Sequence, residues 1–285
     1  MDITAKMVKD LRERTGAGMM DCKKALVESD GDMEKAIEIL RKKGTAVAAK
    51  RAEKTANEGL VLTKISSDKK HGTIIEINCE TDFVAKSKDF VVLANQVLES
   101  AHEKKSATVD ELLNGNGELK NNVTEVLGKV GEKIEISRIA NEEAEKGLLV
   151  DYTHMGSKLA VLVKFDSVNE GTDELNEIGK DIAMQVAAMN PICVKRDDVP
   201  KDTIEKEIEI YKEVSRKEGK PENILDKIAN GKLNKFYQES VLTEQVYIKD
   251  NTKTVGDLIK DFNTKHNSEV NISLFHRFHL GDENK

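Results

Sequence analysis

The same order of strand and helix patterns occurs twice along this sequence of 285 residues. In the first series, alternating β-branched residues predict strands at 60–65, 73–79 and 133–139, with helical spacing between the second and the third. The second series has strand patterns at 147–153, 159–165 and 270–274 and helical patterns at 182–188 and 254–259. We infer two related β-β-α-α-β units, each a small antiparallel sheet backed by helices, so the predicted fold class is α+β.

The amino-terminal region has a helical pattern of its own, typical of a three-helix bundle. Thr4 and Asp32 are suited to cap the first and third helices, and the second is predicted from about residue 19 to residue 28. Residues 46–54 are predicted as a short helical linker. The predicted domains are the bundle with its linker at 1–55, a core N-subdomain at 56–140 and a core C-subdomain at 141–285.

An extra segment at about 199–240 interrupts the second unit and reads as a helical hairpin. Ile204, Ile208, Tyr211 and Val214 recur on one face of its first helix, and a second helix follows residues 219–221. A two-helix arm with two apolar stripes cannot bury both of them unaided. The hairpin could pack on its own body, or it could project and contact a partner or a second copy of the chain, which would give a homodimer.

Charge and cysteine usage narrow the function classes. The chain has 45 Lys and Arg against 52 Asp and Glu, a net charge of −7, which argues against direct nucleic-acid binding. Cys22, Cys79 and Cys193 lie far apart without a Cys-x-x-Cys pair, as in proteins with reduced thiols. The amino terminus lacks an apolar signal region, and no stretch approaches the ~20 apolar residues of a membrane span. We therefore expect a cytoplasmic protein that does not bind membranes.

Catalytic motifs are missing from the sequence. It contains no Gly-x-x-x-x-Gly-Lys-Ser/Thr, Gly-x-Gly-x-x-Gly, His-Glu-x-x-His or Gly-x-Ser-x-Gly. His276 and His279 are spaced to lie on opposite faces of a strand, so we do not assign them as metal ligands. The carboxylates adjacent to Cys79 would raise the pKa of its thiol, which disfavours a nucleophile. We predict no enzyme activity, no catalytic residues, no cofactor and no metal.

Residues 78–86 form a corner between a predicted strand and a predicted helix. Thr81 or Asp82 could cap that helix, because either side-chain oxygen can accept a bond from its first amide groups. Phe83 could fold into the local core, or the corner could hold Asp82 and Phe83 out toward another molecule. Met19 and Met20 leave the same choice, because they could fill the bundle or offer adaptable apolar contact at its glycine-rich turn.

Four stretches resemble the elongation factor Ts family, in the family's order. They are LRERTGAGMMDCKKAL at 11–26, CETDFVA at 79–85, YTHMG at 152–156 and DIAMQVAA at 181–188. The resemblance covers nearly the whole chain, and the first two motifs are long and specific. It implies a guanine-nucleotide exchange factor for elongation factor Tu, with a ubiquitin-associated-like amino-terminal bundle, a two-part core and a helical hairpin used for dimerisation.

The resemblance also implies where the chain would contact elongation factor Tu. In the family, the Thr-Asp-Phe-Val stretch reaches the GTPase domain of the partner and disturbs its Mg²⁺ site, which points here to Thr81, Asp82, Phe83 and Val84. The secondary contacts carried over are Arg12, Met19, Met20 and His154. Many family members continue past the final strand with a further helical module, whereas this sequence ends at Lys285, so we expect that contact to be missing.

Two other functions remain open at this point. A protein-binding module with a ubiquitin-associated-like bundle would bind its partners without altering a bound nucleotide. A thiol enzyme would lose its activity on Cys79→Ala, whereas an exchange factor should largely keep it.

Overall fold

The computed structural model describes residues 2–168 and 172–282, and it confirms the α+β class. Its helices are α1 (Ala5–Thr15), α2 (Met19–Glu28), α3 (Met33–Arg51), α4 (Asp82–Ala85), α5 (Lys88–Lys104), α6 (Val109–Asn114), α7 (Gly117–Val130), α8 (Thr172–Met189), α9 (Lys201–Lys217), α10 (Glu222–Ser240), α11 (Val255–His266) and the short η1 (Arg196–Asp198) and η2 (Leu242–Glu244). Its strands are β1 (Glu58–Ile65), β2 (His71–Cys79), β3 (Ile134–Glu143), β4 (Gly147–Thr153), β5 (Leu159–Asp166), β6 (Val246–Tyr247), β7 (Asp250–Thr254) and β8 (Asn271–His279). Residues 283–285, at the end of the sequence, lie outside the described residues.

Helices α1, α2 and α3 form the predicted amino-terminal bundle. Thr4 caps α1 by accepting a hydrogen bond from the Met7 amide at 3.3 Å, and Asp32 caps α3 by accepting one from the Lys35 amide at 3.0 Å. Leu11 and Leu26 are fully buried between the helices. Helix α3 continues without a break to Arg51, so most of the predicted linker is its last part rather than a separate segment.

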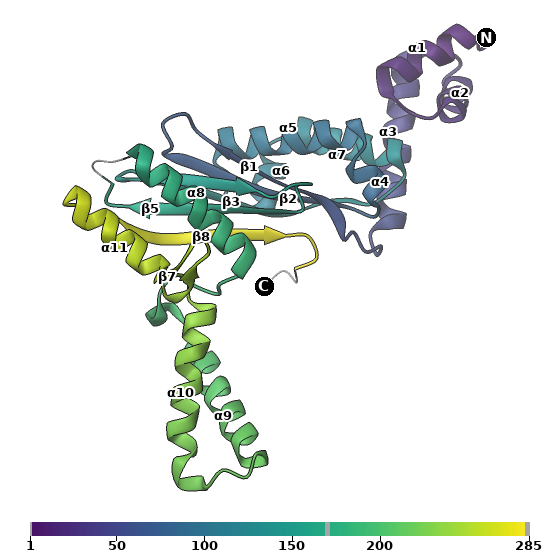
Figure 1. The fold of residues 1–285 in the computed structure, drawn as a ribbon. Helices are drawn as coiled ribbons and strands as arrows, with labels where there is room; N and C mark the ends of the chain where they lie inside the picture. Colours follow the sequence, from purple (N-terminus) through teal and green to yellow (C-terminus); the bar gives the residue numbers. More distant parts are fainter. Residues whose placement is uncertain (1, 169–171, 283–285) are drawn as a thin grey trace.

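Two antiparallel sheets stack at the centre of the molecule, in the strand orders β1-β2-β3 and β4-β5-β8. Ile74 of the first sheet and Leu162 of the second belong to the apolar layer between them. The outer face of the first sheet packs on α5 and α7, and that of the second packs on α8 and α11 (Figure 1). The rigid layers leave the ends of the strands free to present loops and turns.

The helical hairpin of α9 and α10 projects from this core (Figure 1). At its base, Tyr237 is buried, and the Arg196 guanidinium lies 4.2 Å from the centre of the Tyr237 ring. Farther along α9, Ile210 and Val214 remain 51% and 40% exposed. Of the two arrangements considered above, the structure has the projecting one. The short ladder of β6 and β7 beside the hairpin was not predicted.

No helix among the described residues is both long enough and apolar enough to cross a membrane.

Lowering the pH should destabilise the protein through His102, on the face of α5 that packs on β2. His102 stacks on His71 at a ring distance of 4.2 Å, and its Nδ1 lies 2.8 Å from Thr73 Oγ1. Burial, and then the neighbouring His71 and Lys64, lower the pKa of His102 below its ordinary value of 6.5. The folded state therefore binds the proton less readily than the unfolded chain, so this contribution is intact at higher pH and lost as the pH falls below 6.5.

Urea unfolding at about pH 8 and about pH 5 measures this effect. We expect His102→Gln to reduce the loss of stability between the two pH values. His154→Gln, at an exposed turn, is the matched control and should leave the loss unchanged. An unaltered pH dependence in His102→Gln would contradict the assignment.

Candidate functional site

The predicted corner between strand and helix is built from two capped helices rather than one. Thr81 caps the one-turn helix α4, and its Oγ1 accepts a hydrogen bond from the Val84 amide at 3.4 Å. Ser87 then caps α5, with its Oγ accepting from the Phe90 amide at 3.3 Å. Thr81 therefore caps a helix as expected, but this helix is the short α4 and not the long α5, because the chain breaks and restarts at Ser87.

Phe83 projects from this corner. Its side chain is 83% exposed, whereas Ala85 is buried and Val84 packs against the core beneath α5. A single helical turn places neighbouring residues on different faces, so anchoring Val84 and Ala85 turns Phe83 outward. The interpretation that Phe83 folds into the local core was wrong. The four residues predicted as one contact thus divide into a cap (Thr81), an anchor (Val84) and an outward pair (Asp82 and Phe83).

Asp82 places a carboxylate beside the exposed ring. Its Oδ2 accepts a hydrogen bond from Lys86 Nζ at 2.7 Å, and its side chain is 41% exposed. This hydrogen bond, followed by the charges of Lys86 and Lys158, holds the pKa of Asp82 below its usual value. Asp82 is therefore ionised at neutral pH, and solvent or another molecule can reach its carboxylate.

Cys79 lies directly below the corner and is fully buried. Its Sγ donates a hydrogen bond to the Thr81 carbonyl oxygen at 3.2 Å. Burial first, and then the nearby Glu132 carboxylate, raise the pKa of this thiol to about 12. The direction agrees with the sequence-based expectation, but the carboxylates responsible are not the adjacent Glu80 and Asp82. A thiol with this pKa is protonated at neutral pH and is a poor nucleophile.

The structure also brings Arg12, Met19 and Met20 together. All three line one surface groove of the bundle, between α1 and the start of α2. Met19 and Met20 are 59% and 64% exposed, so the interpretation that they fill the bundle core was wrong. A long flexible cation beside two thioether side chains gives an adaptable apolar surface with a positive rim.

His154 occupies the turn between β4 and β5, where its Nδ1 lies 2.8 Å from the Tyr152 hydroxyl. The next residue, Met155, is 91% exposed and was not predicted as a site residue. A large apolar residue beside Gly156 in a two-strand turn was the available signal. The turn lies near the corner, because Lys158 Nζ contacts Glu58 Oε2 at 2.7 Å and Glu58 is opposite Cys79 in the β1–β2 register.

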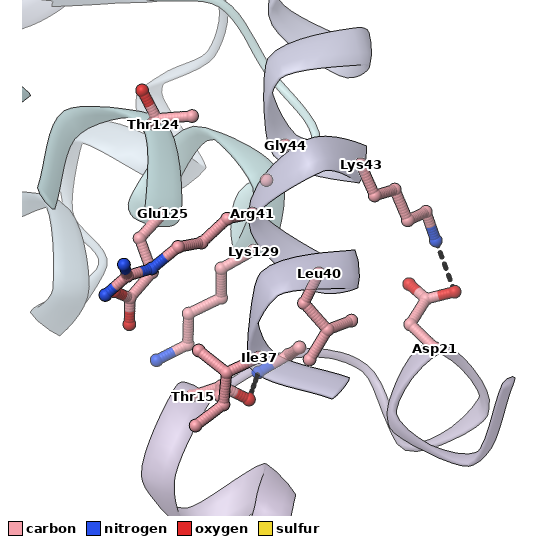
Figure 2. A pocket seen from close by; sticks show the side chains of 12 residues that line it. Thr15, Asp21, Ile37, Leu40, Arg41, Lys43, Gly44, Thr124, Glu125 and Lys129 are labelled. Carbon is pink, nitrogen blue, oxygen red and sulfur yellow. Dashed lines mark hydrogen bonds and ion pairs between the residues drawn. The ribbon is translucent and has the colours of Figure 1, made fainter. Parts of the chain in front are cut away.

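Helix α3 joins the bundle to the core by crossing α7 at two glycines. A Cβ built on Gly128 would lie only 3.0 Å from the Gly44 Cα, so neither helix has room for a side chain there. Figure 2 shows the small pocket beside this crossing, with Lys129 of α7 extending toward the bundle. Lys129 also pairs with Asp89 of α5 at 2.7 Å. No predicted site residue lines the pocket, which belongs to the attachment of the bundle.

The two histidines of β8 each have their own acidic neighbour. His276 Nε2 lies 2.9 Å from Glu142 Oε1, and His279 Nδ1 lies 3.5 Å from Asp282 Oδ1. Within residues 2–168 and 172–282, no group of three or more His, Cys, Asp and Glu side chains is arranged to hold a metal ion.

Fold and site together define an α+β protein that exposes apolar side chains on a braced corner, on a neighbouring turn and on an amino-terminal helical bundle. The family model described as "Elongation factor TS" matches residues 80–282. A protein named elongation factor Ts from Chloroherpeton thalassium is 45% identical over 289 residues, covering 99% of this chain and 99% of that protein. The elongation factor Ts of Chlorobium limicola is 47% identical, covering 98% of this chain and 99% of its own. That of Clostridium botulinum is 45% identical, with 98% and 93% covered. This chain belongs to the elongation factor Ts family.

Proposed function

We propose that this protein is a guanine-nucleotide exchange factor that binds elongation factor Tu with GDP and promotes release of the GDP, which supports translation elongation. Family membership over nearly the whole chain supports the exchange function. The observation that carries the choice of site is the 83% exposure of Phe83 on an otherwise anchored corner. The protein is proposed to act in the cytoplasm without direct contact with nucleic acid or membrane.

The proposed exchange needs no covalent chemistry and no catalytic residue. GDP is held on a GTPase by phosphate contacts together with a bridging Mg²⁺ ion. An exchange factor binds the nucleotide-free conformation of the GTPase more tightly than the GDP-bound one. By thermodynamic linkage, it lowers the affinity of the GTPase for GDP as many-fold as GDP lowers the affinity of the GTPase for the exchange factor. The function therefore requires only a surface that fits one conformation of the partner.

Phe83 is proposed to supply most of this conformational preference. Burying its ring in a crevice of the partner would contribute about 1.5–3 kcal/mol. An exposed ion pair contributes about 0–1 kcal/mol, so Asp82 would guide the ring more than it would drive binding. From beside the ring, the Asp82 carboxylate would disturb the partner's Mg²⁺ site, either at the ion's coordination or at neighbouring amide and cationic groups.

Secondary contacts are proposed at the bundle and at the β4–β5 turn. The groove of Arg12, Met19 and Met20 and the exposed turn at His154 lie on separate elements from the corner. They would contribute affinity, while the corner would contribute the change in the nucleotide site.

The finer domain plan is also a proposal. It consists of a ubiquitin-associated-like bundle at 1–55, core subdomains at 56–140 and 141–285 derived from one repeated unit, and a hairpin insert at about 199–240. The matching strand orders β1-β2-β3 and β4-β5-β8 support the repeat. The exposed Ile210 and Val214 support a homodimer formed through the hairpin.

Release of a fluorescent GDP analogue from elongation factor Tu, followed by stopped flow, tests the function. We expect the chain to accelerate release in proportion to its concentration until the partner is saturated. A protein-binding module would instead form a complex with elongation factor Tu on gel filtration while leaving the release rate unchanged. That result would overturn the proposal.

A further inference from the structure

Two acidic side chains extend the β2–β3 ladder beyond its last backbone pair. The ladder ends where Cys79 pairs with Ile134. Past that point, Glu80 Oε1 accepts a hydrogen bond from the Lys133 amide at 2.6 Å, and Glu132 Oε2 accepts one from the Thr81 amide at 3.0 Å. In a longer ladder, a backbone carbonyl of the neighbouring strand would accept these two hydrogen bonds, and here a side-chain carboxylate accepts each of them. The amides of Lys133 and Thr81 would otherwise have no partner in the ladder.

Each of these carboxylates makes a second bond with its other oxygen. Glu132 Oε1 accepts from the Thr81 hydroxyl at 2.8 Å, and Glu80 Oε2 pairs with Arg51 Nη1 at 2.8 Å. Glu132 therefore accepts from both hydrogen-bond donors of Thr81, the residue that caps α4. Arg51 connects the same corner to the end of α3.

We propose that Glu132 is a positioning residue for nucleotide exchange, acting through Thr81 to fix the direction in which Phe83 projects. The proposal rests on the exchange function proposed above. A helix of a single turn has little stability of its own, so its orientation depends on what holds its ends. Val84 and Ala85 anchor the inner face of α4, and Glu132 fixes the N-cap residue, Thr81, by two charge-assisted hydrogen bonds.

The two hydrogen bonds from Thr81 to Glu132 are called the Glu132 clamp below. Loss of this clamp should affect the maximal rate of exchange more than the affinity for elongation factor Tu. The bundle groove and the β4–β5 turn would still bring the two proteins together. The ring of Phe83 would then point in the productive direction for a smaller share of the time, because the hydrogen bonds that hold the start of α4 would be gone. We expect Glu132→Ala to lower the maximal rate of stimulated GDP release about tenfold and to change the half-saturating concentration by less than about twofold.

A fluorescence measurement on the free protein tests the clamp without reference to exchange. The sequence contains no tryptophan, so the indole introduced by Phe83→Trp would be the only one and would report on the corner alone. We expect Glu132→Ala, in this background, to lower the steady-state anisotropy of the indole. Glu132→Gln keeps one acceptor oxygen and should restore part of it.

Glu135→Ala is the matched control, because it removes the same charge three residues away. Glu135 is 49% exposed and pairs with Lys133 Nζ at 2.6 Å rather than with the corner. Urea unfolding of each variant identifies any general loss of structure, and Glu132→Gln carries the test if Glu132→Ala does not fold. The proposal is overturned if the Glu132 variants match Glu135→Ala in both anisotropy and maximal rate.

Failure of the proposed function would look different. If the unsubstituted chain did not accelerate GDP release, the exchange function would be wrong. The anisotropy comparison would still decide whether Glu132 fixes the corner.

Discussion

Replacing Phe83 by alanine should slow stimulated GDP release from elongation factor Tu by about 10- to 100-fold. This range corresponds to the loss of about 1.5–3 kcal/mol from burial of the ring in the partner, at about 1.4 kcal/mol for each tenfold change. The free energy of unfolding should change by no more than about 0.5 kcal/mol, because the ring is 83% exposed and has few contacts to lose. Stopped-flow release of a fluorescent GDP and urea unfolding measure the two quantities.

Two further variants show whether the effect belongs to this side chain. Phe83→Leu keeps an apolar group on α4 and should retain more activity than Phe83→Ala. Val246→Ala removes apolar surface from a 51% exposed residue of β6 and should leave release unchanged. A rate for Phe83→Ala equal to that of the unsubstituted chain would remove Phe83 from the mechanism.

Local signals in the sequence were sufficient to predict many elements. The bounds predicted for α2 and β4 agree with Met19–Glu28 and Gly147–Thr153 in the structure. Capping residues, glycines at helix ends and the alternation of apolar and polar residues in strands depend only on residues close together in the sequence. They can therefore be recognised from the sequence alone. The β6–β7 ladder was missed because β6 is only two residues long and offers no alternation to detect. The unbroken α3 was missed because its second half packs on α7, which is distant in the sequence.

The site could be located from the sequence, but its geometry could not. The motif placed Thr81, Asp82, Phe83 and Val84 at a corner. Their exposure, however, depends on the phase of the single turn of α4, that is, on which of its residues face the core and which face solvent. That phase follows from Val84 and Ala85 entering the core and from the hydrogen bonds between Thr81 and Glu132. Glu132 lies 51 positions after Thr81 in the sequence, so its carboxylate is beyond the reach of any local pattern.

Replacing Phe90 by alanine should have the opposite consequence to the same change at Phe83. Phe90 is fully buried in the core between the first sheet and α5, so its removal leaves a cavity and should cost about 3–5 kcal/mol of unfolding free energy. The shift in the urea midpoint measures this loss, and Phe90→Leu should recover part of it.

Under conditions in which Phe90→Ala remains folded, its rate of stimulated GDP release should stay close to that of the unsubstituted chain. The reason is that α4 has its own cap at Thr81 and α5 begins with a separate cap at Ser87. A loss of release as large as that of Phe83→Ala, in fully folded protein, would mean that the core beneath α5 sets the direction of the corner. The two phenylalanines, on either side of Ser87, therefore separate contact with the partner from stability of the fold.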